Sequence, residues 1–156
     1  MSRLRRFLLA QADCPRIHFS EPHEYMTIRT ASCSCGQLTA VASGEPLRIS
    51  ICHCLACQRR TGSVFGSQAR FGRVSVIISG RSSQFIRVGD EGYQITFHFC
   101  PECGATVHWE IAGLEDYIAI PVGAFADSAF PAPTISVYES RKHAWVPVPR
   151  GAEHLA

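Results

Sequence analysis

The sequence predicts a mostly β fold in a single domain. Short apolar or alternating segments recur along most of the chain, separated by turn residues. A length of 156 residues is typical of one domain that buries its own core. Hydrophobic content of 46% and charged content of 18% are globular values, and a net charge of +2 does not favour a nucleic-acid or membrane partner.

The first well-patterned strand is expected to begin at Met26, and short turns between the later strands favour mostly antiparallel pairing. Those strands are expected at 38–42, 47–52, 64–71, 74–79, 84–88, 93–99, 105–111, 117–122 and 144–148. One short helical turn is expected from Leu55 to Arg60, with Gly62 as its left-handed cap.

The ends of the chain are less regular than its middle. We expect residues 1–25 to be a loosely ordered N-terminal extension, 26–148 the folded domain and 149–156 a C-terminal tail. The apolar stretch 7–10 is shorter than the roughly 7–15 residues of a signal-peptide core. No apolar run reaches the roughly 18–20 residues of a membrane-spanning helix. Cys14 lies alone in the extension, away from the other seven cysteines, and we assign it no role.

Seven of the eight cysteines fall into three clusters with metal-ligand spacing. The clusters are Cys33-Ser-Cys35-Gly, Cys52-His-Cys54-Leu-Ala-Cys57 and Cys100-Pro-Glu-Cys103-Gly. A structural zinc ion has four protein ligands, whereas a catalytic one keeps a position open for water or substrate. Seven thiolates therefore suggest one closed site and one open site, and two zinc ions per chain.

We assign four cysteines to a structural zinc: Cys33, Cys35, Cys100 and Cys103. The 100–104 segment is a zinc-knuckle sequence in which the turn brings both thiolates to one ion. Residues i and i+2 of a strand face the same side, so Cys33 and Cys35 can also share an ion. Such a site would close a loop of 64 residues (100 minus 35, minus 1). Closing a long loop lowers the conformational entropy of the unfolded chain and so stabilises the fold.

The remaining three cysteines, Cys52, Cys54 and Cys57, are expected to hold a second zinc with one open position. The start of the helical turn would lower the pKa of Cys54. An open position on a thiolate-rich site could bind an incoming thiol as a nucleophile. His53 alternates away from its neighbours in a strand, and we expect it to face elsewhere.

Three alternatives stay open for these cysteines. A disulfide framework is one, although eight cysteines in 156 residues are few for a disulfide scaffold. Thioredoxin-like redox chemistry is another, although a strand pattern follows Cys103 where that motif requires a helix. The third is a pair of purely structural zinc sites, the second completed by His53 or another side chain. Free thiolates indicate a reducing cytoplasm.

The order of the clusters resembles the glutathione-dependent formaldehyde-activating enzyme family, which shares its domain with centromere protein V. The similar segments are Cys33-Ser-Cys-Gly-Gln-Leu, Ile51-Cys-His-Cys-Leu-Ala-Cys-Gln-Arg-Arg-Thr-Gly62 and Phe99-Cys-Pro-Glu-Cys-Gly104, within about Thr27 to Val146. The resemblance implies a β-tent-like fold of coiled antiparallel sheets stapled by zinc, with the two zinc sites assigned above. It also implies an activity that joins glutathione to formaldehyde, giving S-hydroxymethylglutathione.

We therefore expect a zinc-dependent enzyme of the carbon-sulfur lyase type, which adds glutathione or a similar thiol to a small aldehyde such as formaldehyde, or catalyses the reverse. The competing hypothesis is a non-enzymatic, zinc-stabilised protein-interaction module. The expected partners are a small-molecule thiol and an aldehyde, with no nucleic acid and no membrane; the catalytic residues and the oligomeric state stay unassigned.

Basic residues that could receive the carboxylates of glutathione are Arg48, Arg59, Arg60 and Arg70. Histidines that could relay a proton are His53, His98 and His108, and aromatic residues that could form a binding face are Phe65, Phe97 and Trp109.

Overall fold

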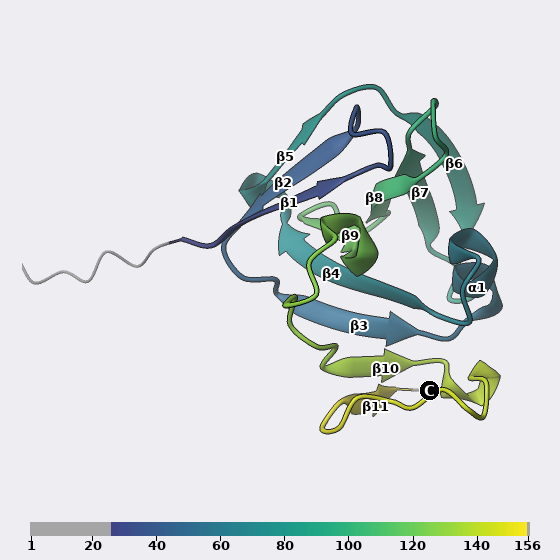
Figure 1. Ribbon diagram of the computed structural model, residues 1–156. Helices are drawn as coiled ribbons and strands as arrows, with labels where there is room; N and C mark the ends of the chain where they lie inside the picture. The colour runs from purple at the N-terminus through teal and green to yellow at the C-terminus, as the bar shows by residue number, and fades with distance from the viewer. Residues whose placement is uncertain (1–25, 156) are drawn as a thin grey trace, which may run out of the picture.

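The computed structural model describes residues 26–155, and over this range the chain is mostly β in one sheet-rich domain. Three strands form a small sheet in the order β1-β2-β5, and eight form a large sheet in the order β11-β10-β3-β4-β9-β8-β7-β6 (Figure 1). The expected extension 1–25, with Cys14, lies outside the described residues. No helix in the described range is long and apolar enough to span a membrane.

The strands are β1 (Ile28–Ser32), β2 (Thr39–Ser43), β3 (Arg48–Cys52), β4 (Gly66–Gly72), β5 (Val76–Ser79), β6 (Ser83–Val88), β7 (Gln94–Phe99), β8 (Thr106–Ile111), β9 (Tyr117–Pro121), β10 (Ile135–Val137) and β11 (Glu153–Leu155). The helix α1 (Leu55–Thr61) and three short 3-10 turns, η1 (Arg73–Ser75), η2 (Val122–Phe125) and η3 (Glu139–Arg141), connect them.

The sequence predicted most of these strands and their antiparallel pairing, and the differences lie near the C-terminus. The expected strand 144–148 is wrong, because this segment forms turns and irregular backbone. Pro147 within it lacks the N–H that a strand ladder requires. The three-residue strand β10 was missed; it pairs parallel with both β3 and β11. The segment 149–156, expected as a tail, contains β11.

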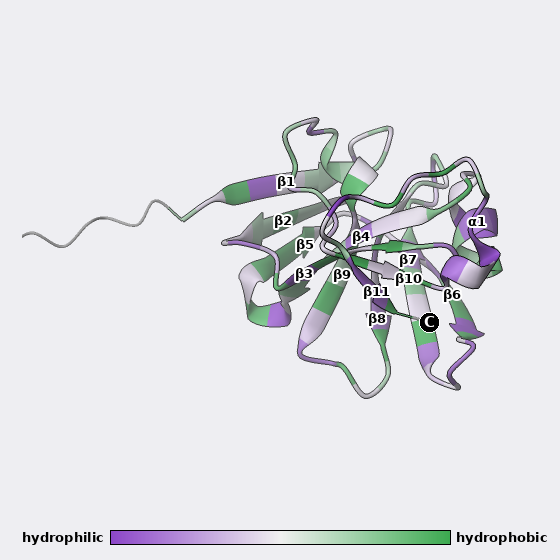
Figure 2. Cartoon of the chain, turned by 90° about the horizontal axis from the view of Figure 1, so that it is seen from below, coloured by the Kyte–Doolittle hydropathy of each residue, from purple (hydrophilic) through white to green (hydrophobic). Residues whose placement is uncertain are grey.

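The predicted helical turn is confirmed as α1. Cys54 is its N-cap, and Gly62 ends it with φ of 64°, a left-handed conformation that glycine adopts without steric cost. No residue of this helix is fully buried, and its ribbon carries purple, hydrophilic segments in Figure 2. The helix therefore adds little to the core and serves mainly to hold the residues at its N-terminus.

The core lies between the two sheets. Small residues of the three-stranded sheet, such as Ala31 and Ala40, pack against larger ones of the eight-stranded sheet, such as Phe71 and Ile118. Alternation along β3 and β4 gives each strand one face in this core and one face turned away from it. Ile49 and Ala69 are in the core, so their neighbours project from the opposite side of the large sheet, where the candidate site is found.

Candidate functional site

Cys52, Cys54 and Cys57 meet where β3 ends and α1 begins. Their sulfur atoms all lie within 4.8 Å of one another. The N-cap position aims the helix N-terminus at Cys54, whose Sγ accepts a hydrogen bond from the Cys57 backbone N–H at 3.3 Å. The local geometry that the spacing predicted, a Cys-x-Cys at a strand end followed by a helical turn, is therefore present.

The three thiols differ in pKa, and therefore in how readily each becomes a thiolate. Hydrogen bonds from Cys52 and Cys57, together with backbone N–H groups, hold the pKa of Cys54 well below its usual range. The Cys54 and Cys57 sulfurs and burial raise the pKa of Cys52. The protein by itself stabilises one thiolate here, and a divalent cation would stabilise the others. This donor set fits zinc, which prefers thiolate ligands in such clusters.

The other four cysteines form a second cluster, in which the turn between β1 and β2 meets the turn between β7 and β8. Cys33 Sγ and Cys35 Sγ are 3.5 Å apart, and Cys35 Sγ and Cys100 Sγ are 3.6 Å apart. Tetrahedral zinc with Zn–S bonds of about 2.3 Å would separate its sulfurs by about 3.8 Å. Cys103 completes the group within 4.8 Å, so the four residues fit one zinc ion.

Donors surround the sulfurs of this four-cysteine cluster. Leu38 N–H lies 3.3 Å from Cys33 Sγ, and Glu102 N–H lies 3.4 Å from Cys100 Sγ. Burial alone would raise the pKa of Cys100, but the side-chain amide of Gln37 and nearby backbone N–H groups lower it to about 6. The polypeptide therefore favours the thiolate form that a metal ion requires.

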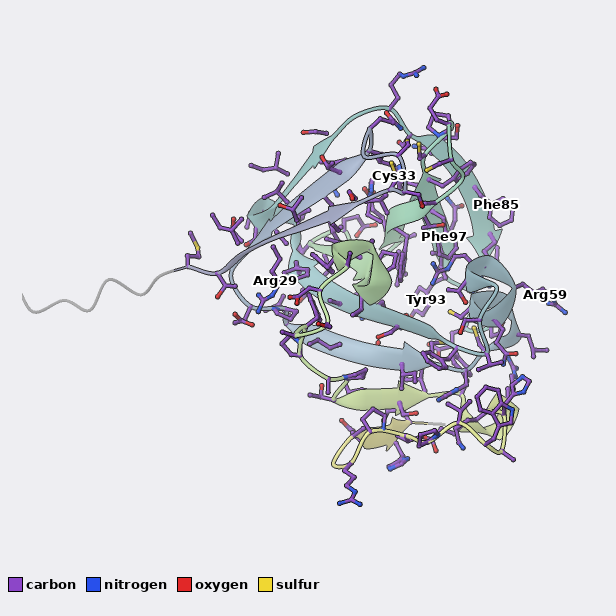
Figure 3. The ribbon with its side chains drawn as sticks, viewed as in Figure 1. Arg29, Cys33, Arg59, Phe85, Tyr93 and Phe97 are labelled. Carbon is purple, nitrogen blue, oxygen red and sulfur yellow. The ribbon has the colours of Figure 1, made fainter. Side chains whose placement is uncertain are left out.

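The seven described cysteines are all free, so no disulfide framework is present among residues 26–155. Figure 3 shows sulfur atoms gathered in two places, one beside the labelled Cys33 and the other beside α1. The structure thus brings the cysteines together in the four-plus-three grouping that the sequence predicted.

The two clusters differ in what surrounds them. A cavity of about 510 Å³ lies on the face of the large sheet that points away from the core, and all three cysteines of the smaller cluster line it. None of the four cysteines of the larger cluster does. A cavity of this size accommodates a small organic ligand.

One wall of the cavity is a ladder across β3 and β4. The pairs are Cys52 with Gly66, Ser50 with Gln68 and Arg48 with Arg70. The wall on the other side is aromatic, with Phe97 and Trp109 packed at a centroid distance of 5.6 Å. Both aromatic residues are about 6% exposed, so they are core-like in burial and also line the cavity.

Four arginines line the cavity: Arg48, Arg60, Arg70 and Arg87. Arg60 lies over the Trp109 ring, with its guanidinium carbon 4.6 Å from the ring centroid. Of the four arginines suggested by the sequence, Arg59 is the exception: it is exposed and points away from the ribbon in Figure 3. Arg87 was missed, because nothing in the β6 sequence indicates that it faces the same cavity as the cysteines.

The three histidines do not lie at the site. His53 is fully buried, with its ring 6.2 Å from that of Phe65 and away from the cavity lining. His98 and His108 stack at a centroid distance of 4.2 Å. Their neighbours Phe97 and Trp109 line the cavity, whereas the two histidines do not. The geometry gives none of the three a position for proton transfer inside the cavity.

A proton-carrying pair that sequence reasoning missed does line the cavity. Tyr138 donates a hydrogen bond from its hydroxyl to Glu91 at 2.9 Å. Burial and this hydrogen bond raise the pKa of Tyr138 to about 12. Tyr138 also has φ of 59°, a strained conformation for a bulky residue that is often found at functional sites. Only the pairing of β10 with β3 places this residue near Cys52, and no local pattern reveals that pairing.

Comparison with known proteins gives three results. The family model described as glutathione-dependent formaldehyde-activating enzyme matches residues 28–141. No curated protein matches the chain. Among solved structures, a Rhodobacter sphaeroides protein superposes with a TM-score of 0.48 and 16% identity, covering 81% of this chain and 99% of that one. The family match spans most of the described residues and all seven clustered cysteines, so the chain belongs to the glutathione-dependent formaldehyde-activating enzyme family.

Proposed function

We propose that this protein is a zinc-dependent enzyme that adds a thiol, glutathione or a close analogue, to a small aldehyde such as formaldehyde, or catalyses the reverse. The observation that carries the proposal is the position of the three-cysteine cluster on the wall of a ligand-sized cavity. Membership of a family named for glutathione and formaldehyde supports the choice of reactants. The reaction makes or breaks one carbon–sulfur bond, which is lyase-type chemistry.

Two zinc sites with different tasks are part of the proposal. Cys33, Cys35, Cys100 and Cys103 would hold a structural zinc, and Cys52, Cys54 and Cys57 a second zinc that faces the cavity. When bound at the second site, zinc supplies Lewis acidity that lowers the pKa of a thiol or polarises a carbonyl. We expect a cytoplasmic location, because cysteines that stay free to bind metal require a reducing environment.

The protein's own residues would then position the reactants and supply a proton. Attack of the thiolate sulfur on the carbonyl carbon forms the C–S bond, breaks the C=O π bond and leaves negative charge on the oxygen. The Tyr138 hydroxyl can turn from Glu91 to protonate that oxygen, because its high pKa keeps the proton in place until a strong base forms. The proton that the thiol released on becoming a thiolate then returns to Tyr138 through solvent, so the number of protons is unchanged. Phe97 and Trp109 close one side of the cavity with apolar surface and limit the access of water.

The decisive test is Cys54→Ala in the cobalt-substituted protein. Removing the central ligand leaves two thiolates, which cannot hold the metal firmly. We expect wild type to show a thiol-dependent change in the thiolate-to-metal charge-transfer band and to accelerate formaldehyde–glutathione exchange in NMR exchange spectra. The Cys54→Ala variant should lose both effects and retain the metal of the four-cysteine cluster. Leu55→Ala is the matched control, because Leu55 is exposed on the same helix and does not line the cavity.

The alternative, a non-enzymatic interaction module, is favoured by one observation. Phe85, Ile86 and Val88 are exposed on β6, the last strand of the large sheet, and Phe85 points outward in Figure 3. Exposed apolar residues on a sheet edge are a common feature of protein-binding surfaces. Equal exchange rates for wild type and Cys54→Ala, across several thiols and aldehydes, would favour this alternative over the enzyme.

A further inference from the structure

Arg48 and Arg70 lie directly opposite each other in the antiparallel pair β3–β4. Like charges in this position repel, and the pairing destabilises a sheet unless something compensates it. Burial and the charge of Arg48 both lower the pKa of Arg70. The two side chains line the same cavity as the three-cysteine cluster, so this repulsion is located inside the proposed active site.

The described part of the chain supplies no counter-charge for this pair. Neither arginine forms an ion pair with any residue in the range 26–155, and the buried Arg48 Nε has no hydrogen-bond partner there. The two acidic residues that line the cavity are engaged elsewhere: Asp90 pairs with Arg141, and Glu91 accepts the hydrogen bond from Tyr138. Arg87 donates to a backbone oxygen. Arg60 also has buried nitrogens without a hydrogen-bond partner in this range, but it lies on the Trp109 ring and its charge acts on the Cys57 thiol, so it belongs to the cysteine end of the cavity.

The ladder fixes where the positive charge lies relative to the cysteines. Arg48, Ser50 and Cys52 project from the same face of β3, because they are two residues apart. At a rise of about 3.3 Å per residue, the Cα atoms of Arg48 and Cys52 are roughly 13 Å apart. Arginine side chains are long and end in a planar fork of N–H donors that matches carboxylate and phosphate oxygens. A thiol of moderate length could reach both ends of the ladder.

We propose that Arg48 and Arg70 form an oxyanion subsite that binds a carboxylate or phosphate group carried by the thiol substrate. The cavity would then select anionic thiols over neutral thiols of the same shape. This inference rests on the proposed function for the position of the thiol, but the subsite itself depends only on the arginine pair. Binding of the anion relieves the repulsion between Arg48 and Arg70, so the ligand supplies a charge that the protein lacks.

The test compares matched ligands in the zinc- or cobalt-loaded protein. Glutathione and glutathione diethyl ester have the same thiol and peptide framework, but the ester lacks both carboxylates. We expect Arg48→Gln and Arg70→Gln each to weaken glutathione binding about tenfold or more and to leave binding of the ester unchanged. Arg59→Gln removes the same charge from the exposed face of α1 and should change neither affinity. Equal binding of glutathione and its ester by wild type, or equal weakening of both ligands in the variants, would overturn the subsite.

A second ligand pair identifies the kind of anion. Phosphopantetheine and pantetheine are thiols that differ by one phosphate group. If the subsite prefers phosphate, phosphopantetheine should show the larger dependence on Arg70; if it prefers carboxylate, glutathione should. Either preference supports an oxyanion subsite. Absence of arginine dependence for both anionic thiols contradicts it.

Two measurements separate failure of the subsite from failure of the proposed function. S-Methylglutathione keeps the carboxylates but has no free thiol, and calorimetry reports its binding without reference to the metal. If it binds wild type at least tenfold more tightly than Arg70→Gln while no thiol changes the cobalt spectrum, the subsite stands and the thiol chemistry fails. If glutathione changes the spectrum of wild type and Arg70→Gln at the same concentrations, the chemistry stands and the subsite fails.

Stability gives an independent check with a characteristic sign. A purely structural arginine should lower the melting temperature when it is replaced. Replacing Arg48 or Arg70 with glutamine removes a like-charge repulsion, so we expect the ligand-free variants to melt at the same temperature as wild type or higher. S-Methylglutathione should raise the melting temperature of wild type and have a much smaller effect on either variant. A lower melting temperature in both ligand-free variants would contradict the proposal.

Discussion

Gln37 donates a hydrogen bond from its side-chain Nε2 to the sulfur of Cys100, at a distance of 2.9 Å. The same amide donates to the backbone oxygen of Arg81 at 2.8 Å, and its Oε1 accepts from the Arg81 N–H at 3.1 Å. One side chain from the β1–β2 turn therefore contacts the β7–β8 turn and the segment between β5 and β6. This contact ties the small sheet to the large one at the four-cysteine cluster.

Replacing Gln37 with leucine should weaken metal retention at the four-cysteine cluster. The substitution keeps a similar side-chain volume and removes the donor that stabilises the Cys100 thiolate. Loss of such a supporting hydrogen bond typically lowers metal affinity about 10- to 100-fold. Chelator competition monitored by metal release measures this change. Gln84→Leu, at an exposed position of β6, is the control, and equal zinc retention in the two variants would rule out a supporting role for Gln37.

Cys103→Ser should destabilise the fold far more than Cys57→Ser. The first removes a ligand from the cluster that joins the two sheets, whereas the second affects only the cluster at the cavity. Loss of a structural metal is one of the few single changes that costs more than about 4 kcal/mol. Thermal unfolding with metal analysis checks both variants. A Cys103→Ser protein that lacks one zinc but melts at the wild-type temperature would refute the structural assignment.

A mild chelator should remove the two metals in order. The three-cysteine cluster has fewer protein ligands and opens to the cavity, so we expect it to lose its zinc first. The protein should keep its fold and one zinc at that stage, as circular dichroism and metal content would show. Loss of both metals together with unfolding would indicate two structural sites, the alternative that the cysteine spacing leaves open.

His108 should make stability depend on pH in the acidic range. Burial and the neighbouring His98 lower its pKa from 6.5 to about 4, so between these values the unfolded state binds more protons than the folded state. Stability should therefore fall as pH decreases from about 6.5 to about 4, by at most about 3 kcal/mol from this group.

Denaturant unfolding of wild type and His108→Gln, with zinc in excess, isolates this contribution. The variant should lose stability less steeply over the same pH range, since other titrating groups are common to both proteins. His143→Gln, which makes the same substitution at an exposed position, is the matched control. Parallel pH profiles for wild type and His108→Gln would contradict the assignment.

The parts of the site that depend on local geometry were predictable from the sequence. Two residues between Cys100 and Cys103, or one between Cys33 and Cys35, determine which sulfurs lie close together, whatever the rest of the chain does. Gly62 likewise marks the end of α1, because the residue there needs a positive φ. Family resemblance and the mostly β fold follow from patterns of this kind, and both are confirmed.

The cavity was not predictable in the same way, because it depends on contacts between distant segments. Arg59 and Arg60 are adjacent in a helix, and only the way α1 lies on the sheet decides that Arg60 faces the cavity. Tyr138 reaches the site through β10, a strand too short to show a periodic pattern. Trp109 and Phe97 are buried like ordinary core residues. An apolar residue in a strand pattern looks the same in the sequence whether it packs in the core or lines a cavity.

The parallel pairing of β10 with β3 has a consequence for the order of events during synthesis. The Thr134 hydroxyl, just before β10, donates a hydrogen bond to the backbone oxygen of Ile49, which lies 85 residues earlier in the sequence. Val137 and Tyr138, which follow Thr134, line the cavity. At a translation rate of about 5–20 residues per second, the cysteines beside β3 leave the ribosome roughly 4–17 s before β10. During that interval the nascent chain presents its three thiols without this wall, and zinc can reach them directly from the surrounding solution.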